Sequence, residues 1–153
     1  MAGKIDGIDG TDWTDPECPV ARTLDLVGDR WSLLVVRDAM DGAQSFGDFQ
    51  RRTGIARNIL SDRLRKLTER GVLERRPGPT GKRPVYLLTP AGRDLFAAVV
   101  ALRQWGERHA FAVGEAHSTL VDAAGRPLPA LVPVDVGGQP LAADGARVVP
   151  AGA

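Results

Sequence analysis

One segment near the middle of the chain limits the fold more than any other, because the sequence defines both its faces and its end. In residues 57–70, Leu60, Leu64 and Leu67 fall within roughly 40° of one another when successive residues turn by about 100°. Gly71 follows directly, and glycine readily takes the left-handed conformation that ends helices. The pattern predicts an amphipathic helix with one buried face.

The residues after this helix predict two short strands joined by an exposed loop. Residues 72–76 and 85–88 read as the strands. The segment between them contains several prolines and glycines, together with Lys82 and Arg83. Proline cannot donate to a strand ladder, so this segment is not expected to pair at its tip. A basic hairpin loop is therefore expected beside the amphipathic helix.

Proline, glycine and capping residues mark the ends of four further predicted helices. They are expected at residues 19–27, 30–40, 46–53 and 89–111. Asp29 and Ser45 are the expected caps of the second and third, and Thr89 of the last. The third helix, the turn at Gly54 and the amphipathic helix then form a helix-turn-helix unit, and the hairpin forms its wing.

These elements predict a mainly α fold with a small β-hairpin wing, a winged helix-turn-helix, and a small irregular or β C-terminal extension. Residues 1–17 are expected to be a flexible acidic leader, and 18–113 a DNA-binding and dimerisation domain. Residues 114–153 form the extension, with small strands expected at 131–134 and 147–149. No internal repeat is evident.

The distribution of charge points to a nucleic-acid partner for the middle of the chain. Residues 18–113 contain 17 basic and 10 acidic side chains, whereas both flanks are acidic. The single cysteine excludes an intramolecular disulfide, and two histidines with one cysteine offer no catalytic set, so an enzyme is not expected. No apolar run is long enough to span a membrane and no signal peptide is evident, which makes a cytoplasmic location the expectation.

The helical wheel selects the residues expected to contact double-stranded DNA. Opposite the leucines, the outward face of the amphipathic helix carries Asn58, Ser61, Asp62 and Arg65. Asn58 is the only asparagine in the chain, and an asparagine amide can pair bidentately with adenine. Phosphate contacts are expected from Arg57 and Arg63 on the flanks of the helix, and contacts to phosphates or the minor groove from Lys82 and Arg83 on the wing.

Residues 18–111 resemble the HxlR-type winged helix-turn-helix transcriptional regulators of bacteria. The resemblance rests on motifs that occur in a consistent order along the chain. They are Cys18-Pro19-Val20, Gly28-Asp29-Arg30-Trp31-Ser32-Leu33-Leu34, Phe46-Gly47-Asp48-Phe49, Ile59-Leu60-Ser61-Asp62-Arg63-Leu64-Arg65-Lys66-Leu67, Gly71-Val72-Leu73 and Val85-Tyr86-Leu87-Leu88-Thr89-Pro90-Ala91-Gly92-Arg93. The resemblance implies homodimers formed through the first and last helices and bound to near-palindromic operators.

The resemblance also bears on three other features. Some members sense oxidants through an N-terminal cysteine, and Cys18 matches that position. Some relatives carry a Cys-x-x-Cys-Gly knuckle in the extension, but Val134 and Gly137 stand where the thiols would be, so neither a metal nor any cofactor is expected. The last helix is apolar around much of its circumference, which predicts a dimer interface made by Leu95, Phe96, Val99, Val100 and Leu102.

Two alternatives to a plain DNA-binding regulator remain open from the sequence. One is a ligand-responsive regulator that binds a small aromatic metabolite as inducer, with Trp31, Trp105 and Phe111 lining a dimer cleft or the extension. The other is a winged-helix module that binds another protein. Thermal-shift screening with metabolites distinguishes the first, and the salt dependence of duplex binding distinguishes the second.

Overall fold

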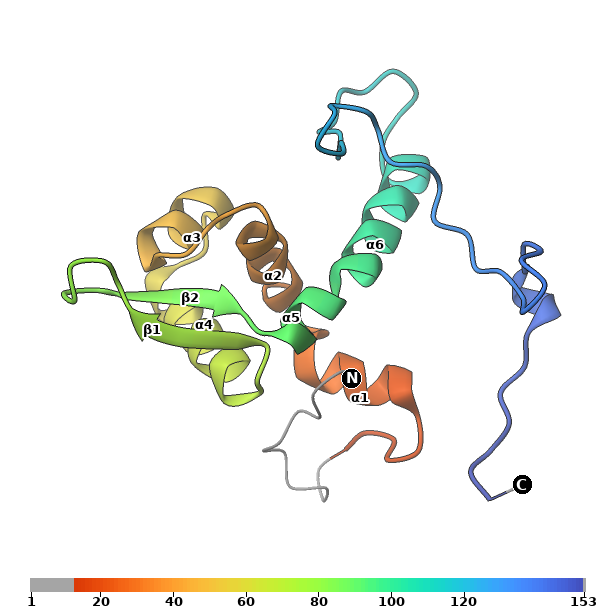
Figure 1. Cartoon of the computed structure of the whole chain (residues 1–153), viewed down its shortest axis with the longest axis horizontal. Helices are drawn as coiled ribbons and strands as arrows, with labels where there is room; N and C mark the ends of the chain where they lie inside the picture. Colours follow the sequence, from red (N-terminus) through yellow and green to blue (C-terminus); the bar gives the residue numbers. More distant parts are fainter. Residues whose placement is uncertain (1–12, 153) are drawn as a thin grey trace. The chain divides into compact units, whose positions relative to one another are not determined.

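The computed structural model describes residues 13–152, which divide along the chain into two compact units, the first ending at Phe96 and the second beginning at Ala97. The first unit has the elements α1 (Pro19–Val27), α2 (Ser32–Met40), α3 (Phe46–Thr53), α4 (Arg57–Glu69), β1 (Leu73–Pro77), β2 (Pro84–Leu88) and α5 (Pro90–Asp94) (Figure 1). Helix α6 (Phe96–His109) begins the second unit, in which η1 (Ala143–Gly145) is a short 3₁₀ turn. The expected winged helix-turn-helix order is confirmed.

The core of the first unit lies between α2, α3, α4 and the hairpin. Helix α4 supplies the three leucines of the amphipathic pattern, Leu60, Leu64 and Leu67, and all are buried. They pack with further buried side chains from the other elements, including Val35, Val36, Phe49, Ile55 and Leu73. The sequence pattern therefore predicts correctly which face of α4 points inward.

The hairpin is antiparallel, with Leu73 opposite Leu88 at one end and Pro77 opposite Pro84 at the other. The sequence pattern places both prolines in the loop, but the structure includes them as the last strand pair, and beyond them the Gly78 N–H donates to the Arg83 carbonyl at 2.9 Å. The hairpin is joined to the segment before α3, because the backbone N–H of Tyr86 donates to the carbonyl of Gln44 at 2.8 Å. The wing is thus fixed to the start of the helix-turn-helix unit.

The predicted single helix from 89 to 111 is wrong in one respect, because the helix is interrupted at Leu95 between α5 and α6. The Leu95 N–H donates to the Gly92 carbonyl at 3.3 Å, which makes a tighter turn than an α-helix. Gly92 itself lies so close to β1 that a Cβ there would come within 2.2 Å of the Val72 carbonyl oxygen. This contact presses α5 against the hairpin.

Two other predictions need adjustment at the N-terminal side. Helix α2 begins at Ser32 rather than at residue 30, although Asp29 does accept the backbone N–H groups of Trp31 and Ser32. Residues 1–12 of the expected leader lie outside the described residues. Its last part is attached to α1, because the Thr14 hydroxyl and backbone N–H both donate to Asp25, at 2.8 and 3.0 Å.

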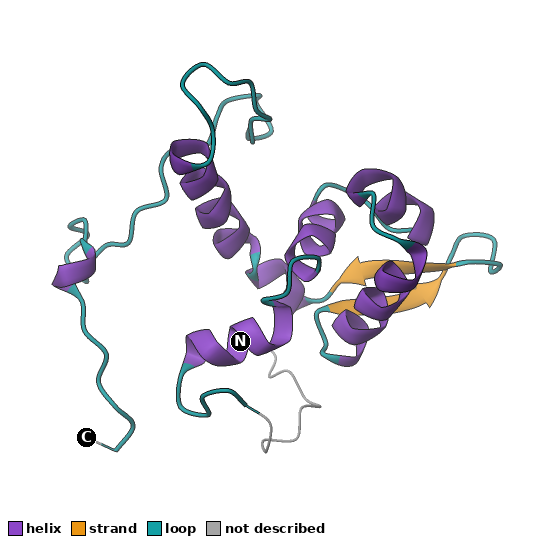
Figure 2. Cartoon of the chain, turned by 180° about the vertical axis from the view of Figure 1, so that it is seen from behind, coloured by secondary structure: helices purple, strands orange, loops and turns teal. Residues whose placement is uncertain are grey.

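The extension after α6 contains a repeat that the sequence analysis missed. Residues 121–128 read Val-Asp-Ala-Ala-Gly-Arg-Pro-Leu and residues 134–141 read Val-Asp-Val-Gly-Gly-Gln-Pro-Leu. Each segment forms one tight loop closed by a single bridge, Val121 to Pro127 and Val134 to Pro140. The small strands expected at 131–134 and 147–149 are absent from the structure, and Figure 2 draws both segments as loop.

The two loops are closed by equivalent aspartates. The Asp122 carboxylate accepts the backbone N–H groups of Ala124 and Arg126 at 2.9 and 3.0 Å. The Asp135 carboxylate accepts those of Gly137 and Gln139 at 2.8 and 2.9 Å. One carboxylate therefore satisfies two backbone donors in each loop, so the loop geometry follows from local hydrogen bonds.

Candidate nucleic-acid interface

Helices α3 and α4 meet in a turn, and hydrogen bonds at the start of α3 and a left-handed glycine at its end define their positions. At the start of α3, the Ser45 hydroxyl accepts the Asp48 N–H at 3.1 Å and the Asp48 carboxylate accepts the Ser45 N–H at 3.0 Å. These bonds and that from the Gln44 N–H hold the pKa of Asp48 down at about 2. At the other end, Gly54 adopts φ 68°, which a side chain would disfavour.

The face of α4 opposite the leucines is open to solvent. Asn58, Ser61 and Arg65 are exposed, and Arg57 is exposed at the start of the helix. Asp62 is partly covered. The structure therefore brings four of the predicted contact residues together on one surface. Arg57 and Asn58 lie at the start of α4, and a recognition helix presents its N-terminal residues to the base edges.

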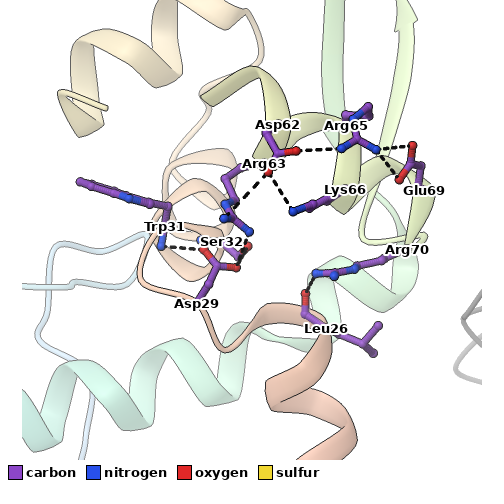
Figure 3. Close-up of polar contacts among 10 residues, drawn as sticks. All are labelled: Leu26, Asp29, Trp31, Ser32, Asp62, Arg63, Arg65, Lys66, Glu69 and Arg70. Atoms are coloured by element: carbon purple, nitrogen blue, oxygen red, sulfur yellow. Dashed lines mark hydrogen bonds and ion pairs between the residues drawn. The ribbon is translucent and has the colours of Figure 1, made fainter. Parts of the chain in front are cut away.

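Ion pairs occupy the charged residues along this face (Figure 3). Arg65 contacts the carboxylates of Asp62 at 2.7 Å and Glu69 at 2.8 Å. Lys66 donates to Asp62 at 3.0 Å, and this hydrogen bond is the main cause that lowers the pKa of Asp62. The positive charge of Arg65 is therefore compensated within the helix, and Asp62 acts as its partner.

Arg63 extends toward the turn between α1 and α2, and its guanidinium also lies 3.9 Å from the Asp62 carboxylate (Figure 3). Its guanidinium lies 3.4 Å from the Asp29 carboxylate, and its side chain is only 24% exposed. Burial alone raises the pKa of Asp29, but hydrogen bonds from the Ser32 side chain and from backbone N–H groups outweigh burial and lower it. Arg63 thus connects α4 to an ionised carboxylate of the same unit, and its expected phosphate contact stays a prediction.

A hydrogen bond fixes the C-terminal end of α4 (Figure 3). Arg70 follows the last residue of the helix and donates to the Leu26 carbonyl oxygen at 2.6 Å. Leu26 belongs to the last turn of α1, where carbonyl groups lack partners within the helix. Together with the Arg63 contact, this bond fixes α4 to α1 and to the turn that follows it.

The wing presents Lys82 and Arg83, both exposed, at the tip of the hairpin. Two neighbouring basic residues that the sequence analysis did not select, Arg75 and Arg76, are exposed on β1. Arg75 also lines a shallow groove of about 270 Å³ together with Ser61 and Arg65 of α4. The register of the two strands identifies Arg75. Arg75 pairs with Tyr86 on β2, and Tyr86 lines the same groove.

A cavity of about 440 Å³ lies where the starts of α3 and α4 meet the wing. Three arginines from three elements line it, namely Arg51 of α3, Arg57 of α4 and Arg83 of the wing. Gly47 and the Phe46 ring also form part of its wall. Arg51 was not predicted as a site residue, because nothing in the sequence around it indicates that α3 reaches the wing.

Cys18 stands immediately before α1 and is partly buried. Its Sγ accepts the backbone N–H of Ala21 at 3.4 Å, as the side chain of an N-cap residue does. Cys18 is therefore the N-cap residue of α1. Redox sensing by this thiol stays a prediction.

The residues expected at a dimer interface differ in their exposure. Leu102 is 56% exposed and Phe96 is 47% exposed, but Val100 is buried within the chain at 6%. Leu95 and Val99 are partly buried. Trp105 on the same helix is 59% exposed, so an interface on α6 has Trp105, Leu102 and Phe96 as its largest available apolar contacts.

The aromatic residues considered for a ligand cleft have separate neighbours. Arg30 lies over the Trp31 ring at 5.0 Å, Trp105 packs against His109 at 5.1 Å, and Phe111 packs against His117 at 5.0 Å between ring centres. Among residues 13–152, no group of histidine, cysteine and carboxylate side chains is arranged to hold a metal ion. In the same residues, no helix is both long enough and apolar enough to cross a membrane.

The fold and the exposed helix beside a basic hairpin define the class of winged helix-turn-helix proteins. Residues 26–113, more than half of the chain, match the HxlR-like helix-turn-helix family. The chain belongs to this family, a family of transcriptional regulators with a helix-turn-helix DNA-binding fold and not of enzymes. The resemblance found in the sequence is confirmed.

Relatives and solved structures agree with this assignment. An uncharacterised HTH-type transcriptional regulator of Mycobacterium tuberculosis is 50% identical over 91 residues, which cover 59% of this chain and 58% of that protein. The crystal structure of PA1607, described as a candidate transcription factor, is 50% identical with a TM-score of 0.83, covering 86% of this chain and 94% of that one. The reduced form of the redox regulator HypR is 30% identical with a TM-score of 0.57, covering 61% of this chain and 94% of that one.

Proposed function

We propose that this chain is a cytoplasmic, sequence-specific regulator that binds double-stranded DNA with α4 in the major groove. The observation that carries the proposal is the pairing of an exposed Asn58–Ser61–Arg65 surface on α4 with a basic wing beside it. A helix fits the major groove, where base edges present distinct donor and acceptor patterns. The wing then lies along the flanking backbone or minor groove.

The proposal divides the predicted contact residues by role. Asn58 and Ser61 are placed to read base edges, with Asn58 suited to adenine. Arg65 reads a guanine once it leaves its carboxylate partners, and Asp62 positions Arg65 until then. Arg57, Lys82 and Arg83 contact phosphates. Arg63 joins this set only if it leaves Asp29, and we assign it to holding α4 in place.

A selection from random duplexes, followed by titration at several salt concentrations, tests this function. A DNA-binding regulator enriches a defined sequence, and its affinity falls steeply as salt rises because phosphate contacts release counterions. Failure to enrich any sequence, with no duplex binding at low salt, would refute the proposal. That outcome would favour the alternative of a module that binds another protein.

The proposed active form is a homodimer on an inverted repeat. The exposed Leu102 and Phe96 side chains of α6 offer apolar surface that a second copy can bury. A two-fold axis through this helix also repeats the recognition helix, and regulators of this kind place their half-sites about one helical turn, ~34 Å, apart. Light scattering at micromolar concentration checks the assembly, and a stable monomer there would contradict it.

Redox control through Cys18 is a second candidate function. It is supported by the position of the thiol at the start of α1 and by the likeness to HypR, a redox regulator. A serine at this position caps a helix at least as well as cysteine, so Cys18→Ser keeps the fold. Oxidant treatment should weaken DNA binding of the wild type and leave the Cys18→Ser variant unaffected. A wild type that does not respond removes this candidate alone.

A further inference from the structure

The cavity between α3, α4 and the wing has a charge distribution that the rest of the proposed interface lacks. Arg51, Arg57 and Arg83 reach it from three separate elements. Like charges gathered at one place repel one another unless an anion lies between them. This cavity therefore favours an anionic ligand more than the ion-paired face of α4 does.

Two arginines of the cavity differ in their neighbours. Arg57 donates to the Gln50 side-chain oxygen at 3.3 Å and lies 4.9 Å from the centre of the Phe46 ring, and both neighbours are uncharged. Arg51 contacts the Asp48 carboxylate at 2.5 Å but remains 73% exposed. Asp48 already accepts backbone N–H groups from Ser45 and Gln44. Three arginines thus line the cavity, and Arg51 among them has a carboxylate partner.

Backbone contacts hold the sides of the cavity together. Ser45 forms a bridge with Val85, and the Tyr86 N–H donates to the Gln44 carbonyl at 2.8 Å, which fixes the base of the wing against the start of α3. Gly47 leaves the wall open between them. A Cβ at Gly47 would lie 3.1 Å from the Nη1 atom of Arg51, inside ordinary contact distance.

We propose that this cavity is a phosphate-binding site that holds one phosphodiester of a DNA strand, with Arg51, Arg57 and Arg83 as donors. The inference rests on the proposed function and adds to it a specific site, with Arg51 as a contact residue. Guanidinium groups match phosphate oxygens through paired N–H donors, which a single ammonium group cannot do. A phosphate here would fix the wing and both helices of the helix-turn-helix unit on one strand.

The test fills the cavity without removing a structural contact. Gly47→Glu places a carboxylate beside Arg51, and a glutamate in the first turn of a helix is favoured by the helix dipole. Gly47→Gln is the uncharged control of the same size. We expect Gly47→Glu to weaken binding to every duplex on the order of tenfold and to lower the salt slope by about one, with a smaller effect for Gly47→Gln.

A second variant tests the donor directly. Arg51→Ala should weaken binding uniformly in the same way, whereas Arg147→Ala, which removes an exposed arginine of the extension, should not. Equal weakening in both arginine variants would show a general charge effect and overturn the site. Thermal unfolding of each variant verifies that the fold is kept.

The outcomes separate this site from the proposed function. If the wild type binds a selected duplex while Gly47→Glu and Arg51→Ala bind it with unchanged affinity and salt slope, the cavity is not a phosphate site and the function stands. If the wild type binds no duplex, the function itself fails. Replacing single phosphates by neutral methylphosphonates should reveal one position that weakens the wild type more than it weakens Arg51→Ala, in which only Arg57 and Arg83 still contact that phosphate.

Discussion

The exposed face of α4 and the cavity beside the wing are both rich in arginine, but they differ in how their arginines are paired. On α4, Arg65 has two carboxylate partners. In the cavity, Arg51 has one carboxylate partner, and Arg57 has the Gln50 amide and the Phe46 ring. An arginine that must leave a carboxylate binds only where the DNA offers a better partner. An uncompensated arginine binds any phosphate. The difference implies that α4 supplies selectivity and the wing side supplies general affinity.

The largest expected effect is on the general affinity of the wing. Replacing Lys82 and Arg83 together by alanine removes two exposed charges that lie outside the paired strand residues. Binding to all duplex sequences should weaken, and the salt slope should fall by about one for each phosphate that these side chains neutralise in the wild type. Titrations on the selected site and on unrelated duplexes at several salt concentrations measure both. Weakening confined to one sequence would show that the wing reads bases and would break the comparison.

The next effect concerns selectivity alone. Asn58→Ala should cost about 1–3 kcal/mol on the selected site if the amide pairs with a base, with little change on unrelated duplexes. Asn58 is exposed, so the free energy of unfolding should not change. Competition between selected and unrelated duplexes directly gives the ratio of the two affinities. Unchanged specific affinity in both Asn58→Ala and Arg65→Ala would mean that this face of α4 does not enter the groove.

The parts of this site that follow local rules are predictable from the sequence. The leucine spacing identifies the buried face of α4, and Gly54, Ser45 and Gly71 mark the ends of helices through backbone conformation and capping. These signals depend on residues a few positions apart. The exposed face of α4 and the hairpin therefore follow from the sequence alone.

The parts that sequence reasoning missed depend on contacts between distant segments. Leu95 is a good helix former, and the interruption there accompanies the close approach of Gly92 to the Val72 carbonyl, which no periodicity reveals. Arg51 reaches the cavity only because β2 is bonded to the segment before α3. The repeat around Asp122 and Asp135 is a different case, because it is visible in the sequence as five identical positions out of eight.

A smaller effect is expected in acid and concerns the carboxylate next to the cavity. Asp48 has a folded pKa of about 2 against an ordinary value of 3.8, because backbone N–H groups of Ser45 and Gln44 favour its charged form. A depressed folded pKa stabilises the protein above the ordinary value, and this contribution disappears as pH falls from 3.8 toward 2. Asp48→Asn should lower the free energy of unfolding near neutral pH and show a shallower decline through that window. Denaturant titrations at a series of pH values measure this, and an unchanged acid slope in the variant would contradict the assignment.

The smallest effect tests the comparison most directly, because it turns Arg65 into an arginine more like those of the cavity. Glu69→Gln removes the charge of one partner, while the Asp62 carboxylate stays at 2.7 Å. An exposed pair at this helical spacing is worth about 0.3–0.5 kcal/mol, so the fold should lose little stability. Arg65 then reaches phosphates and incorrect bases more readily, and affinity for unrelated duplexes should rise by a factor of about two. The ratio of specific to unrelated binding should fall accordingly. If Glu69→Gln instead weakens both kinds of binding, the ion pair orients Arg65 for its base and selectivity depends on the positioning of this side chain.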